Sequence, residues 1–295
     1  MFQRPRFEQG LQANQIPESL LNAMFAVSSR FIPSCDLGRL FGLSAAPWED
    51  FSRWAEYDSR DRLEGNGTLT LDDVKTACLL ALYEYTTYPG RKAWLSAGRL
   101  ARLSYGLRLH QIDCPSSIIP DEEREEWRFV WWAVWRLDST INVIATTPFG
   151  IDSQSIGTAL VSTSVADFTS GIVKKSTQTF LQTDPVRGWE VVQELQSLDP
   201  GDGSHVYLLG VALLRGVSLC QQRLNTNPAA DQLSNMVCLK NAFLHLRVVL
   251  PSWYFSTERQ STERADSHRR RLETLIMLFT WVLLTSPRNT WLMEF

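Results

Sequence analysis

The 295-residue chain has few cysteines, and no two of them are close together. There are five, and the nearest pair, Cys220 and Cys238, is 18 positions apart. Structural zinc sites use pairs of cysteines with two to four residues between them, so a thiolate zinc site of ordinary spacing is excluded. An odd number of widely spaced cysteines in mostly apolar surroundings predicts reduced thiols in an intracellular protein.

Neither sign of charge is in excess, and no apolar run is long. Lys and Arg total 29 against 32 Asp and Glu, which gives a net charge of -3. Strong phosphate binding needs an excess of cations on one face, so this composition argues against direct DNA binding. The longest apolar run, Leu275 to Leu284, is interrupted by Thr280. It is about half the length that a membrane span requires.

The constellations that enzymes use are also missing. The sequence has no phosphate-binding loop and no G-x-S-x-G motif, and no histidine lies three or four residues from another. Asp72-Asp73 lacks the third carboxylate of a magnesium-diphosphate site, and Asp121 to Glu126 is better explained as a helix start. We therefore expect that the protein is not an enzyme and that it has no catalytic, cofactor-binding or metal-binding residues.

What the sequence does contain is helical periodicity. Apolar residues recur three and four positions apart over most of the chain, and no pair of strands joined by a hairpin turn is evident. This pattern predicts an all-α fold, a multi-helix globular bundle. The expected helices cover residues 17–31, 48–63, 71–85, 91–109, 121–145, 203–224, 229–250 and 269–285.

Two segments do not follow the pattern. Residues 1–14 have no apolar stripe and are expected to form a disordered N-terminal extension, with one helical domain over 15–295. Within that domain, 12 of the 33 residues in 151–183 are Ser or Thr, and helical periodicity is absent. We expect 151–183 to be a mobile connection across the surface.

The 121–145 helix is unusually rich in tryptophan, which indicates a large buried contact. Trp131 and Trp132 lie on its apolar arc, and Trp94 lies on the apolar stripe of the 91–109 helix. These three side chains are candidate core residues.

Asp138, seven residues after Trp131, falls on the same apolar face. A buried carboxylate needs a cation or several donors. Arg99, Arg102 and Arg128 are available, and Arg102 is the preferred partner. The pair could fix helix packing, or Asp138 could be a polar group inside a ligand pocket.

The order of motifs adds a family resemblance. Gly90-Arg91-Lys92-Ala93-Trp94-Leu95, Gly106-Leu107-Arg108-Leu109-His110 and the stretch holding Trp131-Trp132 and Leu137-Asp138 stand in sequence. Together they resemble the regulatory, or middle homology, region of fungal binuclear zinc-cluster transcription factors. The resemblance implies an all-α regulatory domain, a nuclear location and a role in transcription, with Trp94, Arg102, Trp131, Trp132 and Asp138 as its structural core.

The resemblance does not extend to the family's zinc cluster, in which six cysteines hold two zinc ions. The chain is therefore expected to carry no zinc cofactor and to act through a DNA-binding transcription factor or a dimer partner, with a small-molecule effector as a further possible ligand. Such regulators often accompany fungal secondary-metabolite gene clusters, so the resemblance implies regulation of one. The alternatives are a stand-alone helical small-molecule receptor and a truncated fragment of a full DNA-binding factor.

Overall fold

The computed structural model describes residues 1–32, 47–64, 67–174, 178–181, 204–226, 237–242 and 244. Helices connected by turns and extended loops make up these residues, and no strand occurs among them. The predicted all-α class is confirmed. The chain divides into two compact units, Met1–Gln178 and Thr179–Phe295.

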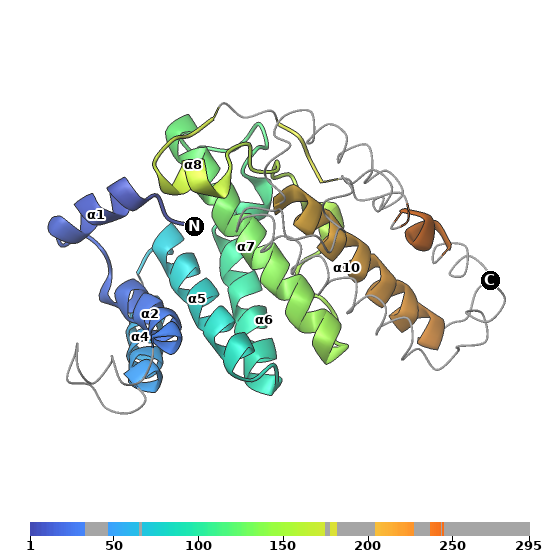
Figure 1. Ribbon diagram of the computed structural model, residues 1–295, viewed down its shortest axis with the longest axis horizontal. Helices are drawn as coiled ribbons and strands as arrows, with labels where there is room; N and C mark the ends of the chain where they lie inside the picture. The colour runs from blue at the N-terminus through green and yellow to red at the C-terminus, as the bar shows by residue number, and fades with distance from the viewer. Residues whose placement is uncertain are drawn as a thin grey trace, which may run out of the picture. The chain divides into compact units, whose positions relative to one another are not determined.

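The first unit holds most of the described helices (Figure 1). They are α1 (Arg4–Gln12), α2 (Glu18–Ser28), α4 (Pro47–Glu64), α5 (Leu71–Thr87), α6 (Arg91–Gly106), α7 (Asp121–Ala145) and α8 (Val165–Thr169). Short 3₁₀ turns lie at Ser29–Phe31, Leu109–Gln111 and Ser153–Ser155. The helices expected over 17–31, 48–63, 71–85, 91–109 and 121–145 correspond to α2, α4, α5, α6 and α7.

Helix α5 starts where the local sequence directs it to start. The Thr70 hydroxyl accepts from the backbone N–H of Asp73, and the Asp73 carboxylate accepts from the N–H of Thr70 at 2.8 Å. This reciprocal capping box pairs two donors that the helix itself cannot satisfy. Arg62 of α4 lies 3.1 Å from the Asp73 carboxylate, so the cap also ties α4 to α5.

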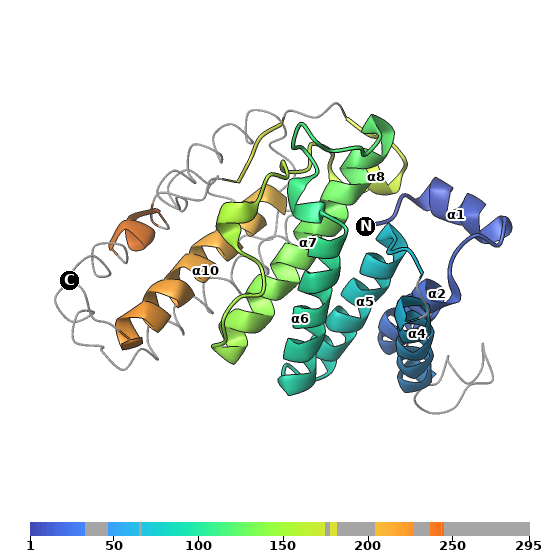
Figure 2. The ribbon, with the colours of Figure 1, turned by 180° about the vertical axis from the view of Figure 1, so that it is seen from behind.

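Helices α5, α6 and α7 lie side by side in both views (Figures 1 and 2). The buried face of α6 is built from Ala93, Ala97, Leu100, Ala101 and Ser104. Its alanines recur at i, i+4 and i+8, which places three small side chains in one row and permits close approach of the neighbouring helices. On α7, Trp131, Trp132 and Trp135 are buried, as a long helix covered on more than one side requires.

The prediction of a disordered segment over 1–14 is wrong. Residues Arg4–Gln12 form α1, with a proline in the first turn and an Arg4–Glu8 ion pair of 2.7 Å along its surface. A proline at that position loses no intrahelical hydrogen bond, and an i,i+4 pair supports a short helix. No residue of α1 is buried, so the apolar stripe by which helices are found in a sequence is absent.

The prediction of a mobile connection over 151–183 is wrong for the part that the structure describes. Ile151, Leu160, Val161 and Phe168 are buried, and Phe168 stacks on Phe129 of α7 with ring centroids 4.1 Å apart. Several of its backbone N–H groups donate to buried carboxylates outside the segment, namely those of Ile151, Ala159, Ser162 and Thr163. Residues 175–177 and 182–183 lie outside the described residues.

The second unit is described only in part. Helix α10 (Ser204–Thr226) confirms the helix expected over 203–224. Of the helix expected over 229–250, residues 237–242 are helical, and Leu239 packs against α10 at Gly216. A Cβ atom at Gly216 would come within 2.9 Å of Leu239 Cδ2, so glycine permits this contact. The helix expected over 269–285 lies outside the described residues.

Candidate functional site

Two of the five residues predicted for the structural core are not in it. The Trp94 side chain on α6 is 38% exposed, because the buried face of that helix carries the small residues Ala93 and Ala97 instead. Arg102 is exposed and makes no ion pair or hydrogen bond with any residue that the structure describes. The predicted Arg102–Asp138 pair is therefore wrong.

Asp138 is buried as predicted, and it binds a loop. Its carboxylate accepts hydrogen bonds from Asn142 Nδ2 at 2.8 Å and from the backbone N–H groups of Gly150 at 2.9 Å and Ile151 at 3.2 Å. A Cβ atom at Gly150 would lie 3.0 Å from Asp138 Oδ1 and 3.1 Å from the Cβ of Ala101, so glycine allows the loop to approach. Asp138 thus fixes the turn that follows α7.

Trp131 and Trp132 lie in the core as predicted. Trp131 is fully buried, and its ring meets Trp132 edge to face with centroids 6.5 Å apart. Trp132 Nε1 donates to the carbonyl of Ala159 at 2.8 Å, which holds the segment after α7 against the helix. Trp132 therefore joins α7 to the chain that follows it, and Trp131 packs beside it in the core.

A buried charge cluster joins Arg128 and Glu125 of α7 to Asp113, which precedes the helix. The sequence indicates Arg128 only as a possible partner for Asp138. The Arg128 guanidinium pairs with Asp113, with Nε 2.9 Å from Oδ2, and with Glu125 at 3.0 Å. All three side chains are almost completely buried.

The acids of this cluster also bind backbone. Asp113 accepts from the N–H of Ala159 at 2.8 Å, and Glu125 accepts from those of Ser162 and Thr163 at 2.6 and 2.8 Å. The cluster therefore orders residues 159–163. It leaves no open face for a ligand, and we assign it a structural role.

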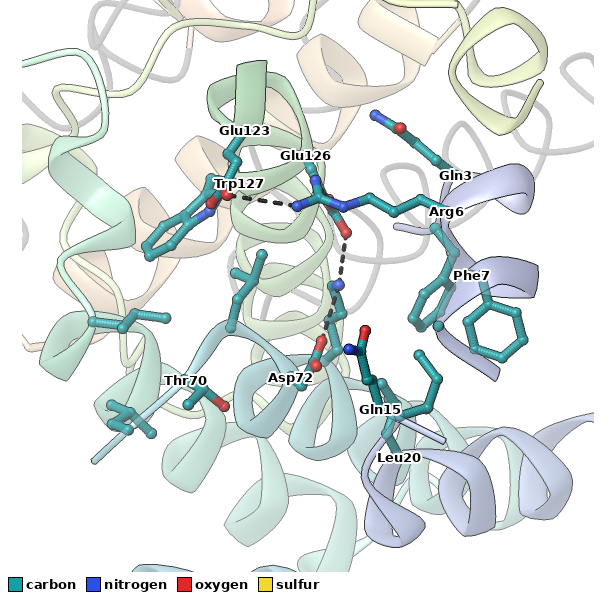
Figure 3. Close-up of a pocket in the computed structure, with 17 residues that line it drawn as sticks. Gln3, Arg6, Phe7, Gln15, Leu20, Thr70, Asp72, Glu123, Glu126 and Trp127 are labelled. Carbon is teal, nitrogen blue, oxygen red and sulfur yellow. Dashed lines mark hydrogen bonds and ion pairs between the residues drawn. The ribbon is translucent and has the colours of Figure 1, made fainter. Parts of the chain in front are cut away.

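A cavity that could hold a ligand lies elsewhere in the first unit, between the α1 segment and the N-terminal ends of α5 and α7 (Figure 3). Its volume is about 500 Å³, within the range of small-molecule sites. Aromatic side chains come from the N-terminal segment, as Phe2 just before α1 and Phe7 within it, and from α7, as Trp127. None of the five predicted core residues lines it.

A chain of five charged groups crosses this pocket. Arg6 reaches from α1 to Glu123 at 3.5 Å and to Glu126 at 3.2 Å, as Figure 3 shows. Lys75 of α5 lies 2.6 Å from Glu126 and 3.1 Å from Asp72. Lys75 and Glu126 are nearly buried, whereas Arg6 is half exposed.

The sequence contains one signal for this network. Lys75 stands between Val74 and Thr76 on an apolar helix, where a buried ammonium group needs an acidic partner. Arg6 gives no comparable signal because its helix has no apolar face. Its partners lie 117 and 120 positions further along the chain.

Among the described residues, no group of three or more His, Cys, Asp or Glu side chains could hold a metal ion. Among the described cysteines Cys78 is fully enclosed, and burial raises the pKa of its thiol to about 11, so it is protonated at neutral pH. Within the same residues, no helix is long and apolar enough to cross a membrane.

His110 gives the core a dependence on pH. Burial, and secondarily the charge of Arg108, lower the pKa of its imidazole below the usual value, and its ring packs on Tyr105 with centroids 4.7 Å apart. A pKa lowered by folding means that the unfolded state takes up the proton first. The His110 contribution to stability is therefore present above the unfolded pKa of about 6.5 and is lost as pH falls.

We expect the free energy of unfolding to decrease more steeply between pH 7.5 and 5.5 in the native sequence than in His110→Gln, because glutamine does not titrate. Urea denaturation at a series of pH values measures both slopes. Equal slopes would show that His110 has the same pKa in the folded and unfolded states.

Comparison with known proteins identifies the family. The sequence pattern of the fungal specific transcription factor domain matches residues 1–189, more than half of the 295-residue chain. The chain belongs to this family. This membership confirms the resemblance that the motifs around Trp94, Gly106 and Trp131 indicate. No solved structure matches this chain significantly.

Several curated relatives share part of the domain. The transcription factor tazR of Aspergillus terreus is 36% identical over 98 residues, which are 32% of this chain and 16% of the relative. The citrinin biosynthesis transcriptional activator ctnR of Monascus purpureus is 33% identical over 101 residues, 33% of this chain and 18% of the relative.

The ascochitine biosynthesis cluster transcriptional regulator of Didymella fabae is 31% identical over 100 residues, 32% of this chain and 18% of the relative. The matches thus span less than a fifth of the length of each of these relatives. The family and the names of the relatives indicate transcription factors rather than enzymes.

Proposed function

We propose that this fungal transcription factor domain regulates the transcription of a secondary-metabolite biosynthetic gene cluster in the nucleus. The observation that carries the proposal is the family match over residues 1–189 together with relatives named as regulators of citrinin and ascochitine biosynthesis. The buried α7 core and the loop fixed to it by Asp138 supply the rigid helical scaffold that such a regulatory domain needs.

We further propose that DNA recognition is supplied by a DNA-binding partner. Within the 295 residues the closest cysteines are Cys220 and Cys238, so the six closely spaced ligands of a binuclear zinc cluster are not present in this sequence. The net charge of -3 provides no general excess of cations for phosphate contacts. Reading the genomic DNA upstream of the Met1 codon distinguishes a partner chain from an attached zinc cluster, since six closely spaced cysteine codons there would assign the cluster to the same polypeptide.

Purified residues 1–295 are expected to show no sequence-specific binding to duplex DNA at physiological salt. The physical reason is the lack of both a zinc module and a surplus of cations. A gel-shift series with promoter fragments from the candidate gene cluster, each competed with unrelated duplex DNA, measures this. Specific binding with a submicromolar Kd by these residues alone would contradict the requirement for a partner.

A further inference from the structure

The side chains that line the pocket between α1, α5 and α7 carry more negative than positive charge. Three carboxylates line it, those of Asp72, Glu123 and Glu126, against two cations, Arg6 and Lys75. The remaining lining residues are uncharged, so the formal charge of the lining is -1. Glu123 belongs to the first turn of α7, where the helix dipole favours an ionised carboxylate. A cationic ligand is therefore favoured over an anionic one.

The ion pairs of Arg6 with Glu123 and Glu126 are weak. The two contacts are 3.5 and 3.2 Å long, and the Arg6 side chain is half exposed. Because solvent reaches the Arg6 side of both pairs, screening limits their contribution to stability, and α1 itself buries no residue. A guanidinium group of the chain thus fills a site from which a competing cation can displace it.

The surroundings of the carboxylates suit a cation that carries an aromatic ring. Trp127 follows Glu123 by four residues on α7, so the two side chains lie on the same face of the helix. Phe2 lines the pocket on the α1 side, and Lys75 Nζ already lies 5.3 Å from the centroid of its ring. Positive groups are attracted to the faces of aromatic rings, most strongly to that of tryptophan.

We propose that this pocket binds a small aromatic cation of the amidinium or guanidinium class. Its planar fork binds the carboxylates of Glu123 and Glu126 in place of Arg6, and its ring packs against Trp127. Binding breaks the two ion pairs between α1 and α7 and so couples occupation of the pocket to the attachment of α1. The binding step goes beyond the proposed function in transcription and is measured without DNA.

Benzamidine and benzamide are the probes, since they have nearly the same shape and differ in charge. Isothermal titration calorimetry of the full chain is expected to show benzamidine binding more tightly than benzamide. In Arg6→Ala the Kd for benzamidine is expected to decrease roughly two- to tenfold, because the internal competitor is gone. The matched control Arg4→Ala lies on the same helix outside the pocket and is expected to leave the Kd unchanged.

Substitution of the carboxylates tests the other half of the site. Glu123→Gln is expected to weaken benzamidine binding roughly tenfold, the effect of removing a hydrogen bond to a charged group, and to leave benzamide binding unchanged. Glu122→Gln, at the neighbouring exposed position outside the pocket, is the control. Glu123 is itself partly exposed, so its replacement by glutamine preserves the fold, and circular dichroism verifies this.

Trp127→Leu provides a second variant that leaves every charge in place, and it is expected to weaken benzamidine binding several-fold. Equal binding of benzamidine and benzamide, or equal effects of Arg6→Ala and Arg4→Ala, would overturn the proposal. So would tighter binding of N-acetylarginine amide than of benzamidine, since that result would assign the site to an arginine side chain of a peptide. None of these outcomes bears on whether the domain regulates transcription.

Discussion

Replacing Trp131 by alanine is expected to lower the free energy of unfolding by about 3–5 kcal/mol, the range for a large aromatic removed from a packed interior. Trp131 is fully buried, with Trp132 edge to face on it and the His110 ring 6.3 Å away. Its indole nitrogen has no hydrogen-bond partner among the described residues, so the loss is one of packing alone. Urea denaturation followed by circular dichroism measures the change.

Trp54→Ala is the matched control for this prediction. The Trp54 side chain on α4 is 53% exposed, so its removal is expected to cost less than about 1 kcal/mol. A cost below 1 kcal/mol for Trp131→Ala as well would show that this face of α7 is not the core of the first unit.

Replacing Arg128 by leucine is expected to destabilise the fold by a similar amount, about 3–5 kcal/mol. The substitution leaves the buried carboxylates of Asp113 and Glu125 without the guanidinium that pairs with both. The same acids hold the backbone of Ala159, Ser162 and Thr163, so the loss extends to the segment after α7. Denaturant unfolding measures the stability, and hydrogen exchange at 159–163 reports the local effect.

An exposed arginine provides the comparison for Arg128. Arg53 pairs with Asp50 on the surface of α4, and Arg53→Leu is expected to change stability by less than about 1 kcal/mol. If Arg128→Leu lowered the free energy of unfolding as little as Arg53→Leu, the buried cluster would not stabilise the fold.

The sequence predicts the helices of the first unit well where an apolar face and a local start signal coincide. The capping box at Thr70 and the acids after Pro120 mark the starts of α5 and α7, and the spacing of Trp131 and Trp132 marks the buried arc. These signals are local, because they depend on residues within one or two turns of each other.

What the sequence does not reveal depends on contacts between distant residues. Asp138 is satisfied by backbone N–H groups of Gly150 and Ile151, whereas the local pattern favoured Arg102. Almost every residue type has a backbone N–H group, so the sequence does not indicate which of them donate to Asp138. The position of α1 also depends on distant residues, because Arg6 forms ion pairs with Glu123 and Glu126 across the pocket.

For the segment after α7, the sequence predicts too little order rather than a wrong partner. Its Ser and Thr content is typical of exposed loops, yet buried acids of the Arg128 cluster bind its backbone and its apolar side chains pack inward. Composition describes the side chains of such a segment, whereas its order comes from its main chain. The prediction that Trp94 is buried is wrong for a related reason. The buried face of α6 carries the small residues Ala93 and Ala97, which allow the neighbouring helices to approach closely.

Deletion of the gene most directly tests whether the protein regulates the transcription of biosynthetic genes. Transcripts are measured across the genome in the parent strain, in the deletion strain and in a deletion strain that carries the gene again. We expect a coordinated change in the transcripts of one contiguous group of biosynthetic genes, reversed when the gene is restored. Unchanged transcript levels for every such group, under conditions in which the gene is expressed, would contradict it.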